Sequence, residues 1–160
     1  ALETTRGIIR KEKMHLDKIA KALLEKEVLE RKKLFLGICV GMQILFRDGD
    51  EHSEGALHQG VGIWQEGITK LDAPILPHMG WNTVDVSANS TLFKGIEDQS
   101  FYFVHSYAAK KAVGHIQTWS THNEKFLAAV EDGAIAATQF HPEKSGDAGL
   151  ALIKNWVGTL

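Results

Sequence analysis

The chain has a single cysteine, Cys39, in the stretch Gly-Ile-Cys-Val-Gly (37–41). Glycines two residues to either side of a nucleophile are typical of a nucleophile elbow, a strained turn between a strand and a helix that exposes the reactive side chain. At the beginning of a helix, partial positive charge favours a thiolate over a thiol, and the N–H of Val40 would point to where an oxyanion forms. Buried, inert cysteines also occur beside glycines, so the pattern indicates catalysis only if a base accompanies it.

His141 is the candidate base. It directly follows an apolar strand in Ala-Thr-Gln-Phe-His-Pro-Glu-Lys-Ser-Gly (137–146), and Pro142 ends the strand there. In an extended segment Glu143 lies on the same side as His141, where a carboxylate can fix the imidazole tautomer and stabilise the imidazolium. A cysteine, a histidine and a glutamate in these settings predict acyl transfer through a thioester.

The elements that must position these residues follow from the hydrophobic pattern. Between residues 6 and 33, ten Lys or Arg stand against five acids, and the apolar residues have helical spacing, which predicts an amphipathic helix with a basic outer face. The remaining expected elements are a strand at 34–38, a helix beginning at 41–46, a polar loop at 48–62, strands at 62–71, 81–86, 100–109 and 113–122, a hairpin at 126–140 with its turn at Asp132-Gly133, and a closing helix at 147–158.

This order predicts one α/β domain over residues 1–160, with a mixed, largely parallel sheet and flanking helices. A length of 160 residues with 44% hydrophobic and 24% charged residues suits an ordinary globular domain. The formal charge of −2 gives no reason to expect a nucleic acid or an anionic membrane as partner. No apolar run reaches the ~20 residues of a membrane helix, and we expect no secretion signal.

The single cysteine also bears on compartment and metal binding. It cannot form an internal disulfide, which fits a reducing compartment, and we expect a cytoplasmic protein. His52 and His58 lie in the polar loop with no thiolate nearby, so we expect no metal site. The chemistry of cysteine, histidine and glutamate calls for no cofactor.

Four stretches carry a family resemblance. Gly-Ile-Cys-Val-Gly-Met-Gln (37–43) and Thr-Gln-Phe-His-Pro-Glu-Lys-Ser-Gly (138–146) resemble the class I glutamine amidotransferases, which have a flavodoxin-like fold. Pro-His-Met-Gly-Trp-Asn-Thr-Val (77–84) and Phe-Tyr-Phe-Val-His-Ser-Tyr (101–107) resemble the glutaminase subunits of imidazole glycerol phosphate synthases. The resemblance runs from about Leu34 to Val157, and the four motifs together are far more specific than any one alone.

The resemblance implies roles for individual residues. Cys39 is the nucleophile, His141 the base and Glu143 the carboxylate that orients it. The residues implied for the bound glutamine are Gln43, Ser106, Tyr107 and, by a weaker alignment, Glu54. The residues implied for the face toward the cyclase (synthase) subunit are His78, Met79, Gly80, Trp81 and Asn82; ordinary core packing is the alternative for Trp81.

The implied activity is hydrolysis of L-glutamine to glutamate and ammonia, with ammonia passed to the cyclase subunit in histidine biosynthesis. Family members begin with a strand, a helix, a second strand and a Pro-Gly-Val-Gly loop that supplies a second oxyanion donor. Only 38 residues precede Cys39 here, and none matches that loop, so we expect a domain that lacks the N-terminal strands and is truncated or altered there. Loss of an oxyanion donor typically lowers the rate about 10²–10³-fold.

Three alternatives remain at this point. One is a glutaminase of the same class serving GMP, anthranilate, carbamoyl phosphate or pyridoxal phosphate synthesis, against which the 77–82 motif argues. Another is a non-catalytic subunit that docks to a synthase, which the missing loop favours and the intact Cys39, His141 and Glu143 oppose. The third is a Cys-His hydrolase such as a peptidase. Gln43 and the 104–107 stretch argue against it, because they suit a small amino acid better than a peptide as substrate.

Overall fold

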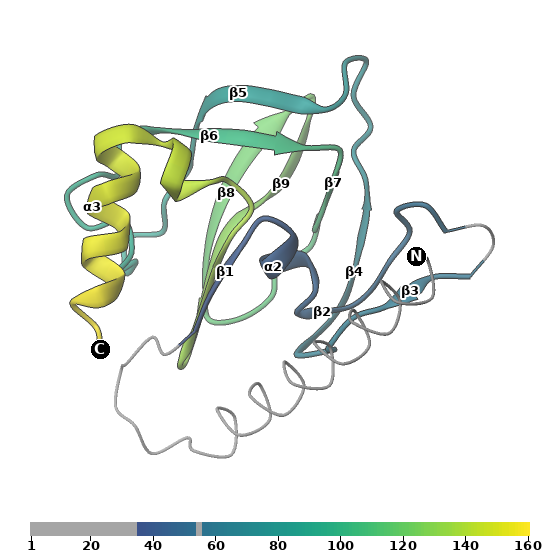
Figure 1. The fold of residues 1–160 in the computed structure, drawn as a ribbon, viewed down its shortest axis with the longest axis horizontal. Helices are drawn as coiled ribbons and strands as arrows, with labels where there is room; N and C mark the ends of the chain where they lie inside the picture. Colours follow the sequence, from purple (N-terminus) through teal and green to yellow (C-terminus); the bar gives the residue numbers. More distant parts are fainter. Residues whose placement is uncertain (1–34, 54–55) are drawn as a thin grey trace, which may run out of the picture.

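The computed structural model describes residues 35–53 and 56–160. The helix expected at 6–33 and the candidate residue Glu54 therefore lie outside the described residues. The described elements, in chain order, are β1 (Phe35–Ile38), α2 (Val40–Gln43), β2 (Phe46–Gly49), β3 (His58–Gln59), β4 (Trp64–Lys70), β5 (His78–Thr83), β6 (Ser100–His105), β7 (Tyr107–Ala108), β8 (Ile116–His122), β9 (Glu124–Asp132), β10 (Ile135–Thr138), the 3₁₀ turn η1 (Pro142–Lys144) and α3 (Gly146–Val157) (Figure 1).

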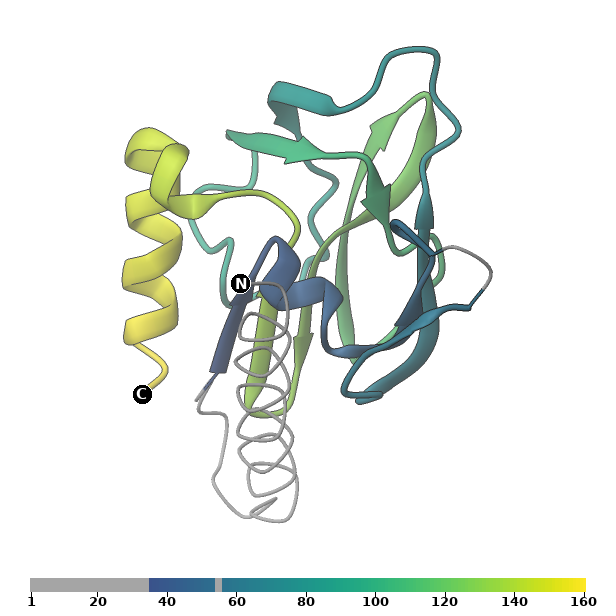
Figure 2. The same ribbon diagram turned by 45° about the vertical axis from the view of Figure 1, so that its right-hand side comes forward.

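The strands form a central sheet, a second sheet and a two-stranded ribbon. The central sheet has the order β1-β10-β9-β8, and the second has the order β3-β2-β4-β7. The ribbon consists of β5 and β6, which pair antiparallel along their whole length from His78↔His105 to Thr83↔Ser100. Figures 1 and 2 both show α3 on one side of the central sheet and the second sheet on the other.

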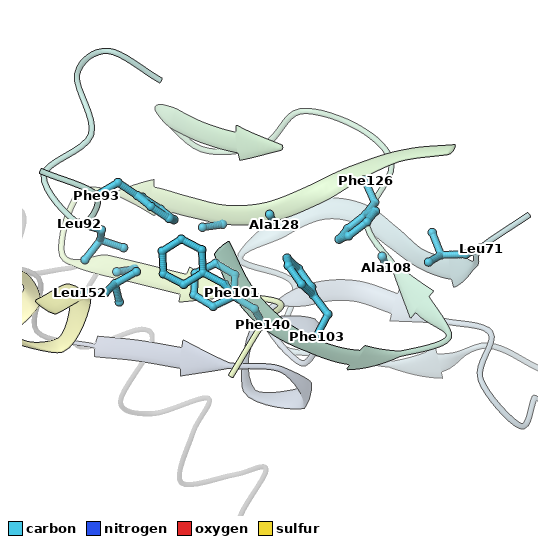
Figure 3. Close-up of a cluster of buried hydrophobic side chains, with 12 residues drawn as sticks. Leu71, Leu92, Phe93, Phe101, Phe103, Ala108, Phe126, Ala128, Phe140 and Leu152 are labelled. Atoms are coloured by element: carbon cyan, nitrogen blue, oxygen red, sulfur yellow. The ribbon is translucent and has the colours of Figure 1, made fainter. Parts of the chain in front are cut away.

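The central sheet is buried on both faces because its inner strands carry apolar residues at successive positions. Residues 126–130 of β9 and 135–138 of β10 are all buried. On one face a cluster rich in phenylalanine includes Phe101 and Phe103 of β6 and Leu152 of α3, and its side chains run in one continuous band (Figure 3). On the other face, Met42 of α2 packs in a second cluster with residues of β2 and β4. Leu36 and Phe35 of β1 pack against the first and the second cluster, so β1 lies between two cores.

The mixed α/β fold is confirmed, but the share of parallel pairing is smaller than expected. Among the described strands, β1 pairs parallel to β10 and β2 parallel to β4, whereas the other five pairings are antiparallel. Antiparallel neighbours can be joined by short turns, and the chain connects β8, β9 and β10 in that way. Parallel neighbours need a long crossover, which is harder to recognise from the apolar pattern of the strands alone.

Some of the strands and helices expected from the sequence are present as predicted, and others differ in length or number. The hairpin at 126–140 is present as β9 and β10, with Gly133 at φ 54° in its turn, a conformation that glycine adopts without strain. The strand pair expected at 62–71 is a single strand, β4. The helix expected to begin at 41–46 is one turn, α2, because the chain enters β2 at Phe46. Among the described helices, none has the length and apolar character that crossing a bilayer requires.

Candidate active site

Cys39 lies at the tip of a sharp turn between β1 and α2, as an elbow requires. Its backbone has φ 52° and ψ −111°, which is uncommon for a residue with a side chain and stores strain. The last residue of β1, Ile38, pairs with Thr138 of β10, and the N–H of Cys39 continues the ladder to the Thr138 carbonyl at 2.7 Å. Parallel pairing to β10 therefore fixes the cysteine beside the segment that leads to His141.

The two glycines that flank the cysteine are not equivalent. A Cβ atom on Gly37 would lie 2.7 Å from the carbonyl oxygen of Gly41, so no side chain fits at residue 37 without moving backbone. A Cβ atom on Gly41 would meet nothing within 4 Å. Of the two flanking residues, only residue 37, at the strand end of the elbow, therefore has to be glycine for lack of space.

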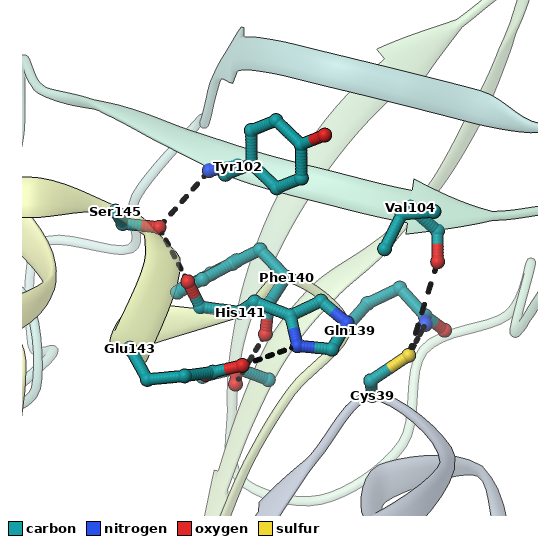
Figure 4. A network of polar contacts seen from close by, with 9 residues as sticks. Cys39, Tyr102, Val104, Gln139, Phe140, His141, Glu143 and Ser145 are labelled. Carbon is teal, nitrogen blue, oxygen red and sulfur yellow. Dashed lines mark hydrogen bonds and ion pairs between the residues drawn. The ribbon is translucent and has the colours of Figure 1, made fainter.

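The sulfur of Cys39 is half-buried and touches two groups that the sequence motif does not contain. Its S–H faces the carbonyl of Val104 in β6 at 4.0 Å, and Nε2 of Gln139 lies 3.8 Å from the sulfur (Figure 4). Burial raises the pKa of Cys39 above its ordinary value and the charge of Glu143 raises it further, while a hydrogen bond from the Val40 N–H lowers it. The N–H at the helix start thus favours the thiolate, but burial outweighs it and the net pKa of Cys39 lies above the ordinary value.

His141 and Glu143 form the closest polar contact at the site. Nδ1 of His141 donates to Oε1 of Glu143 at 2.6 Å, across the 3₁₀ turn that begins at Pro142. A carboxylate only accepts hydrogen bonds, so the proton of a neutral imidazole lies on Nδ1 and Nε2 is left as the basic nitrogen. In Figure 4 the Nδ1 edge of the ring faces Glu143 and the opposite edge is turned toward Cys39. Among the described residues, no hydrogen bond yet joins the sulfur to His141.

Ser145 holds the backbone of His141 by hydrogen bonds, a role that the sequence does not predict. Its Oγ donates to the His141 carbonyl at 2.7 Å and accepts the N–H of Tyr102 in β6 at 3.0 Å. The N–H of His141 in turn donates to the Tyr102 carbonyl at 2.9 Å. The histidine is therefore tied by its backbone to the strand whose Val104 carbonyl faces the thiol. The buried Ser145 is a polar residue at a helix start, a pattern that could have drawn attention to it.

Gln43 and Gln139 form a second polar pair beside the cysteine. Nε2 of Gln43 donates to Oε1 of Gln139 at 3.0 Å and to the carbonyl of Tyr107 at 2.9 Å. Gln139 is fully buried at the end of an apolar strand, and a buried amide in such a strand is the signal that could have identified it. Of the residues expected to hold glutamine, Gln43 and Tyr107 are thus in contact. Ser106 lies at the bend between β6 and β7, where its carbonyl accepts the N–H of Leu71 at 2.9 Å.

A pocket of about 150 Å³ opens beside the elbow, between α2 and the second sheet. Its lining includes Val40 and Gln43 of α2, Asp48 of β2 and Glu51 in the loop beyond it. Carboxylate and amide oxygens of this kind can accept hydrogen bonds from the ammonium group of a small amino acid, whereas a long peptide needs an open groove. Within the described ranges, no three or more His, Cys, Asp or Glu residues come together as a metal site.

The stretch expected to face a partner forms strand β5, and its residues alternate between two sides. Met79 and Trp81 are 62% and 59% exposed, so core packing is not the role of Trp81. His78 is 5% exposed and points into the protein, which corrects the expectation that its side chain meets a partner. Gly80 has φ 131°, and Asn82 donates to His78 and to the Thr121 carbonyl at 2.9 Å. Only Met79 and Trp81 offer large apolar side chains outward.

The elbow cysteine therefore follows a strand that pairs parallel with the strand leading to the histidine and glutamate pair. A family model described as glutamine amidotransferase class-I matches residues 17–158. The chain belongs to the class-I glutamine amidotransferase family. It is 58% identical over 129 residues to imidazole glycerol phosphate synthase subunit HisH of Mycobacterium bovis, covering 78% of this chain and 62% of that protein. It is 47% identical over 146 residues to subunit HisH of Leifsonia xyli subsp. xyli, covering 84% of this chain and 69% of that protein.

Solved structures support the fold. A glutamine amidotransferase from Thermotoga maritima superimposes with a TM-score of 0.53 at 18% identity, over 91% of this chain and 52% of that one. A second glutamine amidotransferase structure superimposes with a TM-score of 0.50 at 14% identity, over 76% of this chain and 60% of that one. These likenesses confirm the predicted fold class, and the chain spans about three fifths of the length of the Mycobacterium relative.

Proposed function

We propose that the chain is the glutaminase subunit of an imidazole glycerol phosphate synthase. The observation that carries the proposal is the position of Cys39 at a strained elbow whose neighbouring strand leads directly to His141 and Glu143. Similarity to HisH proteins at 47–58% identity supports this member of the class over glutaminases of other pathways. The proposal includes L-glutamine as substrate, a cyclase subunit as partner and the cytoplasm as compartment.

The reaction divides into two half-reactions. In the first, Nε2 of His141 takes the proton from the Cys39 thiol, and the sulfur attacks the side-chain amide carbon of glutamine. The C–N bond then breaks as His141 returns that proton to the leaving nitrogen, which departs as ammonia and leaves a glutamyl thioester on Cys39. In the second, His141 takes a proton from water as the oxygen attacks the thioester, and the thiol is restored as glutamate leaves.

Glu143 serves both half-reactions by keeping the imidazole in one tautomer. Its contact with Nδ1 leaves Nε2 as the basic nitrogen and stabilises the imidazolium that forms after proton transfer. Because burial raises the pKa of Cys39 above its ordinary value, the thiol is protonated at neutral pH before the reaction begins. Proton transfer to His141 is therefore part of the reaction and does not precede it.

The oxyanion of the tetrahedral intermediate needs donors beside Cys39. The Val40 N–H already points at the sulfur, so it lies at the correct end of α2 for this task. Nε2 of Gln139 also approaches the sulfur, at 3.8 Å. These two groups are the donors that the described residues bring to the reacting centre, and we assign the oxyanion to Val40 as first donor.

The pocket lined by Gln43 and Glu51 would hold the amino-acid end of glutamine, with its side-chain amide directed at Cys39. The exposed Met79 and Trp81 of β5 would contact the cyclase subunit, because a large apolar side chain on a strand surface is a common interface anchor. β5 pairs with β6, whose Val104 carbonyl faces the sulfur, so such a partner would lie close to the released ammonia. Transfer without exposure to water would keep ammonia unprotonated.

The test is ammonia release from glutamine by the chain alone and with the cyclase subunit and its ribulosyl ligand, with Cys39→Ala as the blank. Release that depends on the liganded partner and on Cys39 supports a coupled glutaminase. If the chain folds and binds the partner but releases no more ammonia than Cys39→Ala, the chain is a non-catalytic binding subunit. Release of amino acids from a peptide substrate would instead indicate a peptidase.

A further inference from the structure

A line of hydrogen-bonded polar groups, with two buried histidines at its centre, connects Gln43 in the lining of the pocket with strand β5. It begins at the carbonyl of Tyr107, which accepts hydrogen bonds from Nε2 of Gln43 at 2.9 Å and from Nδ1 of His105 at 3.0 Å. The line continues from Nε2 of His105 to Nδ1 of His78 at 3.1 Å, and from Nε2 of His78 to Nδ2 of Asn82 at 3.2 Å. None of the roles assigned so far uses the imidazoles of His78 and His105.

A single protonation pattern satisfies every contact in this line. The Tyr107 carbonyl only accepts, so His105 must carry its proton on Nδ1 and present Nε2 as an acceptor. His78 must then donate from Nδ1 and accept at Nε2. Asn82 supplies the matching donor, because its Oδ1 accepts the Thr83 N–H at 2.8 Å and its Nδ2 therefore faces His78.

The surroundings of the two imidazoles favour this neutral pattern. His78 and His105 are 5% and 7% exposed. His78 stacks on Phe103 and on His122, with ring centroids 4.8 Å and 4.3 Å apart, and His105 lies edge-on to Phe126 at 4.8 Å. Burial lowers the pKa of His78 to about 4 and that of His105 to about 3. A second proton on either ring would face another donor, or apolar rings, with no acceptor available in the line.

We propose that His105 is a positioning residue that holds the Tyr107 carbonyl, and through it the Gln43 amide, while His78 and Asn82 on β5 fix the tautomer in which His105 donates to that carbonyl. The proposal rests on the glutaminase function proposed above. Residues alternate along β5, so the strand that turns His78 and Asn82 inward turns Met79 and Trp81 outward. A partner bound to Met79 and Trp81 would therefore contact the same strand whose inward side chains, His78 and Asn82, are connected by hydrogen bonds to Gln43 in the pocket.

Three substitutions of His105 separate the hydrogen bonds from the packing. His105→Phe keeps a ring against Phe126 and removes both hydrogen bonds. His105→Asn keeps a donor near the position of Nδ1, within reach of the Tyr107 carbonyl, and gives up the contact with His78. His105→Gln places its amide near the position of Nε2, toward His78, and gives up the donor to Tyr107. Phe126→Leu is the matched control, since it loosens the same packing and leaves the line of hydrogen bonds intact.

The readout is KM and kcat for glutamine with the cyclase subunit bound. We expect His105→Phe and His105→Gln to raise KM about tenfold, because the Tyr107 carbonyl then keeps only one of the two hydrogen bonds that fix its position. His105→Asn should stay within about threefold of the parent, and Phe126→Leu should lower the melting temperature without raising KM. An unchanged KM in His105→Phe, or equal effects in His105→Asn and His105→Gln, would overturn the proposal.

An independent measurement needs no turnover. Two-bond ¹H–¹⁵N correlation spectra of the full chain report which ring nitrogen carries the proton, and we expect the Nδ1–H tautomer for both His78 and His105 at neutral pH. An Nε2–H tautomer at either residue would contradict the line of hydrogen bonds. If the parent chain released no ammonia with its partner, the proposed glutaminase function would be refuted. The spectra would still show whether His105 and His78 have the tautomers that this line of hydrogen bonds requires.

Discussion

Nδ1 of His141 lies 2.6 Å from Oε1 of Glu143, and the same carboxylate raises the pKa of Cys39. One side chain therefore has two opposite effects on the reaction. In the proposed reaction it orients the base that activates the thiol, and its negative charge disfavours the thiolate before the base acts. The two effects can be separated, because one requires substrate turnover and the other can be measured on the free thiol.

We expect Glu143→Gln to lower kcat for glutamine by about 10²–10⁴-fold, the usual contribution of general acid–base catalysis. The same substitution removes a negative charge near Cys39, so the pKa of the thiol should fall and alkylation by iodoacetamide at neutral pH should become faster. Alkylation rates across a pH series give the thiol pKa directly. The control is Asp85→Asn, which removes a carboxylate from an exposed salt bridge with Lys125. It should change neither kcat nor the thiol pKa. Slower alkylation in Glu143→Gln would contradict this electrostatic assignment.

The two elbow glycines should respond differently to alanine. Gly37→Ala places a Cβ atom 2.7 Å from the Gly41 carbonyl, so β1 or α2 must shift, and we expect a clear loss of thermal stability and of turnover. Gly41→Ala meets open space within a helical turn and should be neutral or stabilising by up to about 1 kcal/mol. Melting temperatures of the two variants, measured side by side, test this. Equal losses would mean that the turn differs from the one described.

Stability should fall in mild acid because of the buried histidines. Folding lowers the pKa of His78 to about 4 and of His105 to about 3, so between the unfolded value near 6.5 and these values the unfolded chain binds more protons. The free energy of unfolding should therefore be highest above about pH 6.5 and decrease as the pH falls toward 4. Urea titrations at about pH 7 and about pH 5 measure the slope.

Two variants serve as controls for the acid effect. His105→Phe removes one of the two groups and should flatten the pH dependence. His52→Gln changes a side chain that is 92% exposed and should leave the dependence as it is in the parent. If the pH dependence of the free energy of unfolding were unchanged in His105→Phe, groups other than His105 would cause the loss of stability in acid.

Trp81 should matter for partner binding and not for folding. Its side chain is 59% exposed and contacts Tyr102 edge-on at 6.1 Å. We expect Trp81→Ala to weaken binding of the cyclase subunit by about 2 kcal/mol or more, as for other interface anchors, with little change in melting temperature. Calorimetric titration measures the affinity. Leu150→Ala, at a comparably exposed position on α3, is the control and should bind as the parent does.

The sequence predicted the elements that carry Cys39 and His141 better than the contacts around these residues. Cys39 and His141 could be identified because the elbow glycines and the proline after the histidine are local signals at the ends of apolar strands. Gln139 and Ser145 could not be assigned in the same way, since their contacts come from strands and turns that meet only in the folded chain. The motif at 78–82 places His78 with its neighbours on the partner face, because a resemblance in sequence does not show which residues of a strand point inward. The low content of parallel pairing was missed because apolar runs do not reveal strand direction.

The most direct test of the account is a search for the covalent intermediate. The chain, with its partner bound, is mixed with glutamine, quenched in acid during turnover, digested and analysed by mass spectrometry. The account predicts a glutamyl thioester on the peptide that contains Cys39, absent in Cys39→Ala, and enriched in a variant slowed in the hydrolytic step. Ammonia release that continues in Cys39→Ala, or turnover with no adduct on that peptide under any quench time, would contradict it.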